Sequence, residues 1–234
     1  MFAAGRAFEQ IRNAVGYPHL NVKIGATHAG ITVGEDGATH QCLEDIGVMR
    51  TIPGMAIVNP ADAVEARAAV EWAINYKGPV YLRFGRLAVP VIFNGDDYKF
   101  EFGKNVRLRE GKDVTIMASG TTVSIALEAA ELLAAEGISA RVTNVHTIKP
   151  LDTADVLASA AETGAIVTVE EHNVIGGLGS AVAEAVCAAR PVPVVRVGTE
   201  DVFGRSGKVP ALLEAYGLTA ANVAAKAKAA IALK

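Results

Sequence analysis

The sequence predicts an α/β protein with two α/β domains, each built on a mostly parallel sheet flanked by helices. The first observation is that short apolar strands alternate with amphipathic helices along most of the chain. Strands separated by helices pair in parallel through right-handed crossovers. The second is size: 234 residues, 51% of them apolar, are enough for two domains with separate cores. The third is a break in the alternation near the middle of the chain, which indicates a domain boundary there.

Helices and strands alternate through the first 95 residues. A helix is expected over residues 3–15, with Ile11 on its apolar side. Thr39 is predicted to cap the start of a second helix that ends near Arg50, because a threonine hydroxyl can accept from the first free amides of a helix. The other expected elements are a strand opening at 22–24, a strand at 55–58, a helix started by the residues NPAD and a strand at 80–84.

The alternation stops between residues 96 and 112. There Tyr98, Phe100 and Phe102 alternate with charged residues, a period of two that predicts a half-exposed strand or a hairpin. We therefore expect one domain over 1–95, a linker or hairpin over 96–112 and a second domain over 113–234.

The α/β alternation resumes in the second domain. Gly137 is expected just after the first helix of this domain, where a left-handed backbone conformation ends many helices. The expected strands are 114–118, 141–145, 166–169 and 194–197, and the expected helices are 123–136, 153–161, 178–189 and two at the C-terminal end.

Composition excludes several classes of protein. The net charge of −3 is spread along the chain, whereas a nucleic-acid-binding protein usually has a basic stripe. No run of eighteen apolar residues is present and the first residues lack a signal-peptide pattern. Cys42 and Cys187 are far apart, and buried free thiols in a reducing compartment are expected. We therefore expect a cytoplasmic protein that binds neither nucleic acid nor membrane.

The most informative stretch follows the first strand. A polar loop at the carboxyl end of a buried strand is where open α/β sheets bind their ligands. Glycines let such a loop bend and approach a ligand closely. The alternative is an ordinary turn with solvated histidines. The polar side chains and glycines fall within thirteen positions: His28, Gly30, Gly34, Glu35, Asp36, Gly37 and His40.

Several motifs together resemble one enzyme family. ATHAGITVGEDGATHQ, PADAVEARAAV and GPVYLRFGR resemble the pyrimidine-binding domain of transketolase. VTNVHTIKPLD, VEEHNVIGGLGSAVAEAV and FGRSGKVPALLEAYG are similar to the transketolase C-terminal domain, in the same order. The resemblance covers essentially the whole chain and is strongest to the C-terminal half that forms a separate subunit in split bacterial transketolases. It implies a thiamine diphosphate pyrimidine-binding fold that lacks its N-terminal part, followed by the C-terminal domain.

The resemblance assigns roles to five residues. His28 matches a catalytic histidine that contacts the donor sugar, and Asp36 matches a substrate-binding acid. His40 matches a second catalytic histidine, which also contacts the cofactor, although some transketolases have glutamine there. Phe2 resembles an aromatic residue that contacts the aminopyrimidine ring of the cofactor. Arg86 matches an arginine that binds the sugar phosphate.

Two of these roles have open alternatives. Phe2 alone would be read as a frayed terminal aromatic residue, and Arg83 is a second candidate for the phosphate. Glu35 is expected to be structural.

The resemblance also implies an activity and its partners. The reaction would transfer a two-carbon ketol unit between ketose and aldose phosphates, using thiamine diphosphate. Mg²⁺ would be held by a diphosphate-binding subunit, so no metal ligand is assigned to this chain, and the α/β domains would form homo-oligomers. Alternatives are a deoxyxylulose phosphate synthase, a 2-oxo acid dehydrogenase beta subunit such as that of pyruvate dehydrogenase, and a non-catalytic assembly or regulatory subunit.

One family motif is not found in these residues. In the family, a glutamate in a segment resembling IAEQN activates the cofactor, upstream of the position matched by Phe2. No such segment occurs among the 234 residues. We therefore expect residues 1–234 alone to be inactive.

Two further motifs have competing interpretations. GGLGS at residues 176–180 could bind phosphate at a helix N-terminus, but it lacks the full GxGxxG pattern, so a structural turn or subunit contact is favoured. Glu170, Glu171 and His172 could form a metal cluster. Consecutive strand residues point to opposite faces, however, which favours a solvated or interfacial cluster.

Overall fold

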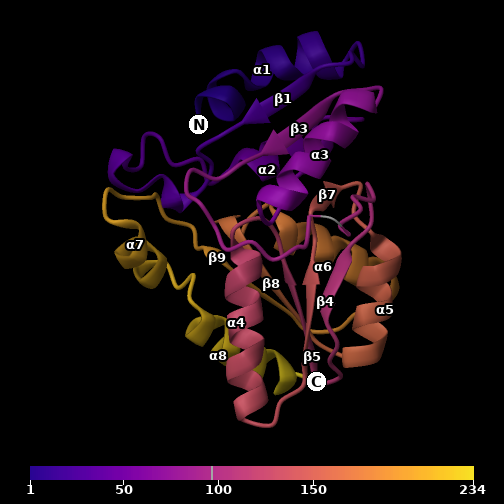
Figure 1. Cartoon of the computed structure of the whole chain (residues 1–234), viewed down its shortest axis with the longest axis vertical. Coiled ribbons are helices and arrows are strands. Elements are labelled where there is room, and N and C mark those ends of the chain that lie inside the picture. Colours follow the sequence, from indigo (N-terminus) through magenta and orange to yellow (C-terminus); the bar gives the residue numbers. More distant parts are fainter. Residues whose placement is uncertain (96) are drawn as a thin grey trace.

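A computed structural model describes residues 1–95 and 97–234, which form two sheets surrounded by helices (Figure 1). The part that begins at the N-terminus lies at the top of the view, and the second sheet with its helices lies below it. The α/β class with two mostly parallel sheets is confirmed. Among the described residues, no helix combines the length and apolarity needed to span a bilayer.

The first sheet has the strand order β1-β3-β2-β7. β1 (Lys23–Ala26), β3 (Val80–Arg83) and β2 (Ala56–Val58) run parallel, as expected for strands joined through helices. β7 (Thr147–Lys149) pairs antiparallel with β2. Because β7 comes from the second half of the chain, this sheet is completed by residues far from the others in sequence.

Helical segments flank the first sheet. The first is a short α-turn between two wider π-helical turns, and Ile11 is buried within it as expected. α3 begins after Asp62, whose carboxylate accepts from the amide of Glu65. The segments are η1 (Phe2–Arg6), α1 (Phe8–Gln10), η2 (Ile11–Gly16), η3 (Ile31–Asp36), α2 (Asp45–Arg50) and α3 (Ala63–Asn75).

The prediction that Thr39 caps a helix is wrong. α2 starts six residues later, after Glu44, and the Thr39 hydroxyl instead lies 3.0 Å from Nδ1 of His40. The residues between Thr39 and α2 are not helical, because Cys42 forms a parallel bridge with Ala29 and the Cys42 carbonyl accepts from the amide of Gly30. Pairing with a distant segment therefore overrides the local capping signal.

The second sheet has the strand order β4-β6-β5-β8-β9. β5 (Val114–Ala118), β6 (Ala140–Asn144), β8 (Ile166–Asn173) and β9 (Val194–Thr199) are parallel. β4 (Val106–Arg109) pairs antiparallel with β6 at the edge.

Helices cover both faces of this sheet. One apolar core packs under α4 and α8, and another packs under α5 and α6. Gly137 follows α4 with a φ of +81°, as predicted for a residue that ends a helix. The helices are α4 (Thr122–Ala135), α5 (Thr153–Thr163), α6 (Leu178–Ala189), α7 (Val209–Ala215) and α8 (Ala220–Ile231).

The linker differs from the expected period-two strand. Phe100 and Phe102 lie outside any strand and pack on Trp72 of α3, with ring centroids 5.5 and 4.2 Å apart. The only strand of the described linker is β4, and Asp96 lies outside the described residues. The alternating aromatic residues are thus explained by packing against a helix of the first domain.

A buried ion pair lies where the two sheets meet. Arg83 at the end of β3 donates to both oxygens of Asp45, at 2.7 and 3.1 Å, and also to the carbonyl of Glu171 in β8, at 2.8 Å. Burial alone would raise the pKa of Asp45, but the charge and hydrogen bonds of Arg83 oppose it and the pKa is lowered. Arg83 thus neutralises a buried carboxylate and joins the two domains.

Removing the charge of Arg83 should strongly destabilise the fold. Arg83→Met keeps much of the volume but leaves Asp45 charged and buried, which should lower the free energy of unfolding by about 3–5 kcal/mol. The matched control is Arg67→Met, because Arg67 pairs with Glu71 on the surface, where the side chains are 83% and 65% exposed. In urea titrations, the control should change the free energy of unfolding by less than about 0.5 kcal/mol. Equal losses for the two variants would contradict the role of the buried pair.

Candidate active site at the carboxyl end of the first sheet

The site is built on residues 27–42, called the site loop below, which directly follows β1. The chain leaves the sheet with the amide of Phe84 donating to Ala26 and the amide of Ala29 donating to Phe84. Between them His28 has a φ of +63°, a left-handed conformation that non-glycine residues seldom adopt. Such strain is typical of functional sites, because the surrounding structure must hold it.

A cavity of about 230 Å³ lies at the end of β1. Four of the five residues with predicted roles line it: Phe2, His28, Asp36 and His40. They come from a helical turn at the chain start and from the site loop. Apolar atoms from Ala4, Ala26, Ala29, Val33 and Tyr81 form much of the rest of the wall. The cavity therefore combines an apolar wall with a few polar groups, as small-molecule sites usually do.

Phe2 and His40, which both line this cavity, are in contact with each other. Their ring centroids are 5.1 Å apart and the rings are nearly perpendicular, an edge-to-face contact. The guanidinium carbon of Arg6 lies 4.6 Å from the Phe2 ring centroid. Phe2 is still 45% exposed, so ring surface remains for a further aromatic partner. The alternative of a frayed terminal residue does not describe this arrangement.

His28 and Asp36 present polar atoms to the same space. Nδ1 of His28 lies 3.0 Å from the hydroxyl of Thr27, which orients the ring. Asp36 ends η3, and its neighbour Glu35 does not line the cavity. Instead, the Glu35 carbonyl accepts from the hydroxyl of Ser206 at 2.6 Å. An imidazole and a carboxylate placed together can grip a sugar hydroxyl, since one can donate and the other accepts.

Arg86 does not line the cavity. Its guanidinium is on the surface and donates to the carbonyl of Val33, in the middle of the site loop. Arg83, the alternative, is buried and fully engaged with Asp45 and Glu171. Of the two arginines, Arg86 is therefore the one that a ligand outside the cavity could reach.

The floor of the cavity includes residues that the sequence reasoning missed. The Tyr81 hydroxyl donates to Asp45 at 2.8 Å, and burial followed by the Asp45 charge raises the pKa of Tyr81. Burial raises the pKa of the Cys42 thiol, which also lines the cavity. A signal existed for Tyr81, because it shares a face of β3 with Arg83 two residues on. The expectation of a buried free thiol is confirmed for Cys42. It is wrong for Cys187, which is exposed.

The motif GGLGS is a structural turn. The first amides of α6 are already satisfied inside the chain, because Glu170 accepts from Leu178 at 2.7 Å and from Gly179 at 2.8 Å. Burial raises the pKa of Glu170. A phosphate would have to displace this carboxylate, so the phosphate interpretation is wrong.

The residues from Glu170 to His172 are buried at the domain seam. Of the two expected arrangements, solvated or interfacial, the solvated one is wrong, since all three side chains are at most 2% exposed. Nε2 of His172 accepts from the amide of Gly47 at 3.2 Å, and Glu171 accepts from the amide of Thr32 at 2.6 Å. The cluster is interfacial in the sense of joining the two domains. Among residues 1–95 and 97–234, no group of three or more His, Cys, Asp or Glu side chains is placed to hold a metal ion.

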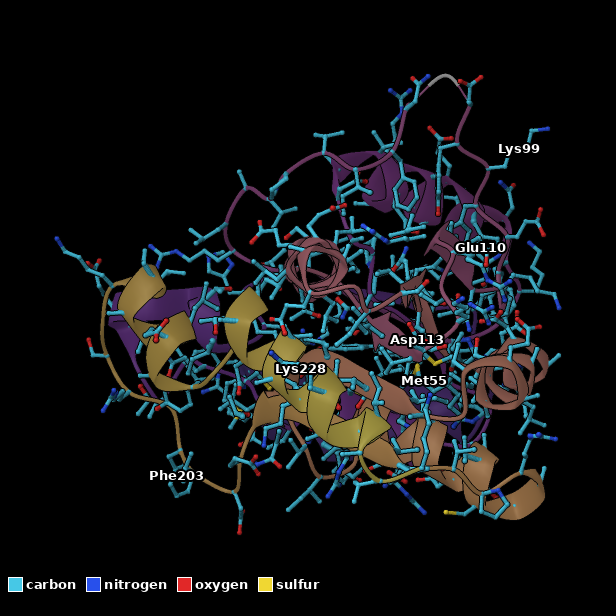
Figure 2. The ribbon with its side chains drawn as sticks, turned by 90° about the horizontal axis from the view of Figure 1, so that it is seen from below. Met55, Lys99, Glu110, Asp113, Phe203 and Lys228 are labelled. Carbon is cyan, nitrogen blue, oxygen red and sulfur yellow. The ribbon has the colours of Figure 1, made fainter. Side chains whose placement is uncertain are left out.

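A larger cavity of about 560 Å³ lies in the second domain, apart from the residues predicted from sequence. It is lined by Arg196, Arg205 and Lys226, and by Phe203, which projects from the loop before α7 and is 85% exposed (Figure 2). The smaller cavity is the better candidate for chemistry, because it is lined by the strained His28 and by Asp36 and His40 of the site loop.

Two family models match successive parts of the chain. The model of the transketolase pyrimidine-binding domain matches residues 1–91, and that of the transketolase C-terminal domain matches residues 103–223. The fold and the first of these models define the class of the chain, that of α/β proteins with a transketolase-type pyrimidine-binding domain. The chain belongs to the transketolase family, of which it represents the C-terminal portion.

Individual relatives are similar over nearly the whole chain. A putative transketolase C-terminal section from Methanocaldococcus jannaschii is 48% identical over 226 residues, covering 96% of this chain and 71% of the relative. A 6-deoxy-6-sulfo-D-fructose transketolase subunit from a Clostridium species is 47% identical, covering 95% of this chain and 69% of the relative. The solved structure of a split-gene transketolase, described as an inactive β4 tetramer, is 53% identical. It matches with a TM-score of 0.92, covering 100% of this chain and 74% of that one.

Proposed function

We propose that this chain is the C-terminal part of a transketolase that moves a two-carbon ketol unit from a ketose phosphate to an aldose phosphate. The observation that carries the proposal is the cavity in which Phe2, His28, Asp36 and His40 converge. The reaction needs a site that binds a flat heterocycle on one side and a polyhydroxylated chain on the other. An aromatic and apolar wall beside two histidines and a carboxylate has this character.

Thiamine diphosphate is the cofactor of the proposal. Support for its aminopyrimidine ring in this cavity is that Phe2 is 45% exposed and that the wall around Ala26 and Tyr81 is apolar. When bound, the cofactor stabilises the carbanion that cleavage of a carbon–carbon bond produces. His40, in edge contact with Phe2, would lie beside the ring and orient it.

The side chains of the site loop would act on the sugar. His28 would hydrogen-bond the reacting carbonyl or hydroxyl group and hold a proton at its imidazole nitrogen. Asp36 would accept from a hydroxyl and so fix the orientation of the chain. Arg86, outside the cavity, would bind the terminal phosphate, for which a guanidinium offers paired donors in a fixed geometry.

The proposal requires further protein. The diphosphate and its Mg²⁺ would be held by a separate diphosphate-binding subunit, and the α/β domains would associate into a homo-oligomer. Support comes from the relatives described as a C-terminal section and as a subunit, and from the neighbour described as a split-gene tetramer. We place the assembly in the cytoplasm and in the pentose phosphate pathway.

Reconstitution tests the proposed function. Residues 1–234 alone should neither bind thiamine diphosphate tightly nor transfer ketol units, because they contain no segment resembling IAEQN. Activity should appear when such an upstream segment is fused and a diphosphate-binding subunit with Mg²⁺ is added, as measured by aldose-dependent consumption of a ketose phosphate.

Different outcomes separate the alternatives. Robust transfer by the 234-residue chain alone would refute the need for partners. A reconstituted assembly that uses only 2-oxo acid donors would indicate a synthase or dehydrogenase subunit. An assembly that binds the cofactor but uses no donor would indicate a non-catalytic subunit.

His28→Ala should lower turnover of the reconstituted enzyme by roughly ten- to a thousandfold, the range for losing one hydrogen-bonding group in the transition state. Thermal stability should hardly change, because His28 is exposed. The matched control is His19→Ala, since His19 also has a positive φ, of 53°, but does not line the cavity. Turnover that is the same in both variants would rule out the assigned role.

Arg86→Ala should raise KM and leave kcat nearly unchanged, because a contact with a distant phosphate is similar in the ground and transition states. The effect should shrink when the phosphorylated donor is replaced by its unphosphorylated analogue. Steady-state kinetics with both donors make the comparison, and an equal loss with each would show that Arg86 does not bind the phosphate.

A further inference from the structure

The site loop is supported from beneath by a strand of the other domain. Glu171 lies in β8, and its side chain is buried, with 2% exposed. One carboxylate oxygen accepts from the backbone amide of Thr32 at 2.6 Å, in the first turn of η3. η3 consists of two helical turns joined by a kink at Gly34, and Asp36, which lines the cavity, ends the second turn. The hydrogen bond to Thr32 therefore fixes the first turn, from which the chain continues through the kink to Asp36.

The backbone of the loop is shaped around this carboxylate. Gly30 has a φ of +88°, and a Cβ at that position would overlap the Glu171 side chain. The amide of Gly30 donates to Cys42 at the other end of the loop. A glycine is therefore required both for the bend and for the close approach.

Glu171 is itself held from both domains. Its second oxygen accepts from the hydroxyl of Thr121, just before α4, at 2.7 Å. Its backbone carbonyl accepts from Arg83 at 2.8 Å. Glu171 does not line the cavity, so it has no direct access to a ligand there.

We propose that Glu171 is a positioning residue through which the second domain sets the geometry of the site loop, and hence of His28 and Asp36. This inference rests on the proposed function only in the role given to those two side chains. A small displacement of groups that contact a substrate can lower the rate by about a hundredfold, so the restraint matters for catalysis as well as for folding.

The length of the Glu171 side chain should matter more for holding the loop than its charge does. In Glu171→Gln, the amide oxygen can still accept from Thr32 while its NH₂ group donates to the hydroxyl of Thr121, which can accept. Glu171→Asp keeps the charge but is one methylene shorter, so its carboxylate cannot span both partners. The two variants therefore separate the geometry of the side chain from its charge.

The first measurement is amide hydrogen exchange on the folded 234-residue chain. Glu171→Asp should speed exchange at Thr32 and through residues 28–41 while leaving β5 and β6 protected, whereas Glu171→Gln should match the parent chain. Exchange in the loop that is the same for both variants would overturn the proposal. Because this readout needs neither cofactor nor partner, it does not depend on the proposed function.

The second measurement uses the reconstituted enzyme. Glu171→Asp should lower kcat/KM by about ten- to a hundredfold and Glu171→Gln by less than about threefold. The control is Asn144→Ala, which removes buried hydrogen bonds to Glu65 of 2.8 and 3.0 Å elsewhere on the domain seam. It should reduce stability without this loss of rate. An equal loss of kcat/KM in Asn144→Ala and Glu171→Asp would overturn the proposal.

A double-mutant cycle with His28→Ala completes the test. If Glu171 acts through the loop, Glu171→Asp should cost much less in the His28→Ala background than alone, whereas independent effects would add. Additive losses would overturn the positioning role. A His28→Ala variant with full activity would instead contradict the proposed function, while hydrogen exchange would still decide whether Glu171 holds the loop.

Discussion

The buried pair of Arg83 and Asp45 is the interaction on which the arrangement of this molecule depends. Arg83 is the last residue of β3 in the first domain. It donates to both carboxylate oxygens of Asp45 in α2 and to the backbone carbonyl of Glu171 in β8 of the second domain. A buried charge is costly unless it is paired and hydrogen-bonded, so these three elements must occupy fixed relative positions. Tyr81, also in β3, donates its hydroxyl to the same carboxylate and lines the cavity. The cavity is thus anchored to the domain seam.

The seam is polar where most cores are apolar, and several of its groups form hydrogen bonds across it. Glu65 in α3 accepts from Asn144 in β6, and burial raises the pKa of this carboxyl group. β7 crosses from the second half of the chain to complete the first sheet. Directional contacts of this kind fix orientation better than apolar packing does, because a hydrogen bond weakens steeply when its angle changes. A site at the edge of the first sheet can therefore be held in place by residues of the second domain.

This arrangement suits the chemistry of the transketolase family. In the proposed function the cofactor would supply the reactivity, so the protein would have to place donors and acceptors accurately around a flexible sugar. In the site loop, His28 has a strained backbone conformation, and Gly30 leaves room for the Glu171 side chain. Strain of this kind persists only when neighbouring contacts over-determine the backbone, and here they come from both domains.

The sequence by itself determined the features that depend on local pattern. Apolar periodicity located β5 and α6 to the residue, and the glycines and histidines after β1 marked the loop that lines the cavity. Only the tertiary structure decided that Thr39 caps no helix, that β7 joins the first sheet, and that Glu170, Glu171 and His172 are buried. Periodicity and turn chemistry reside in neighbouring residues and can be read along the chain. The partners of a buried charge are fixed by which distant segments meet in space, and no local pattern of residues encodes that meeting.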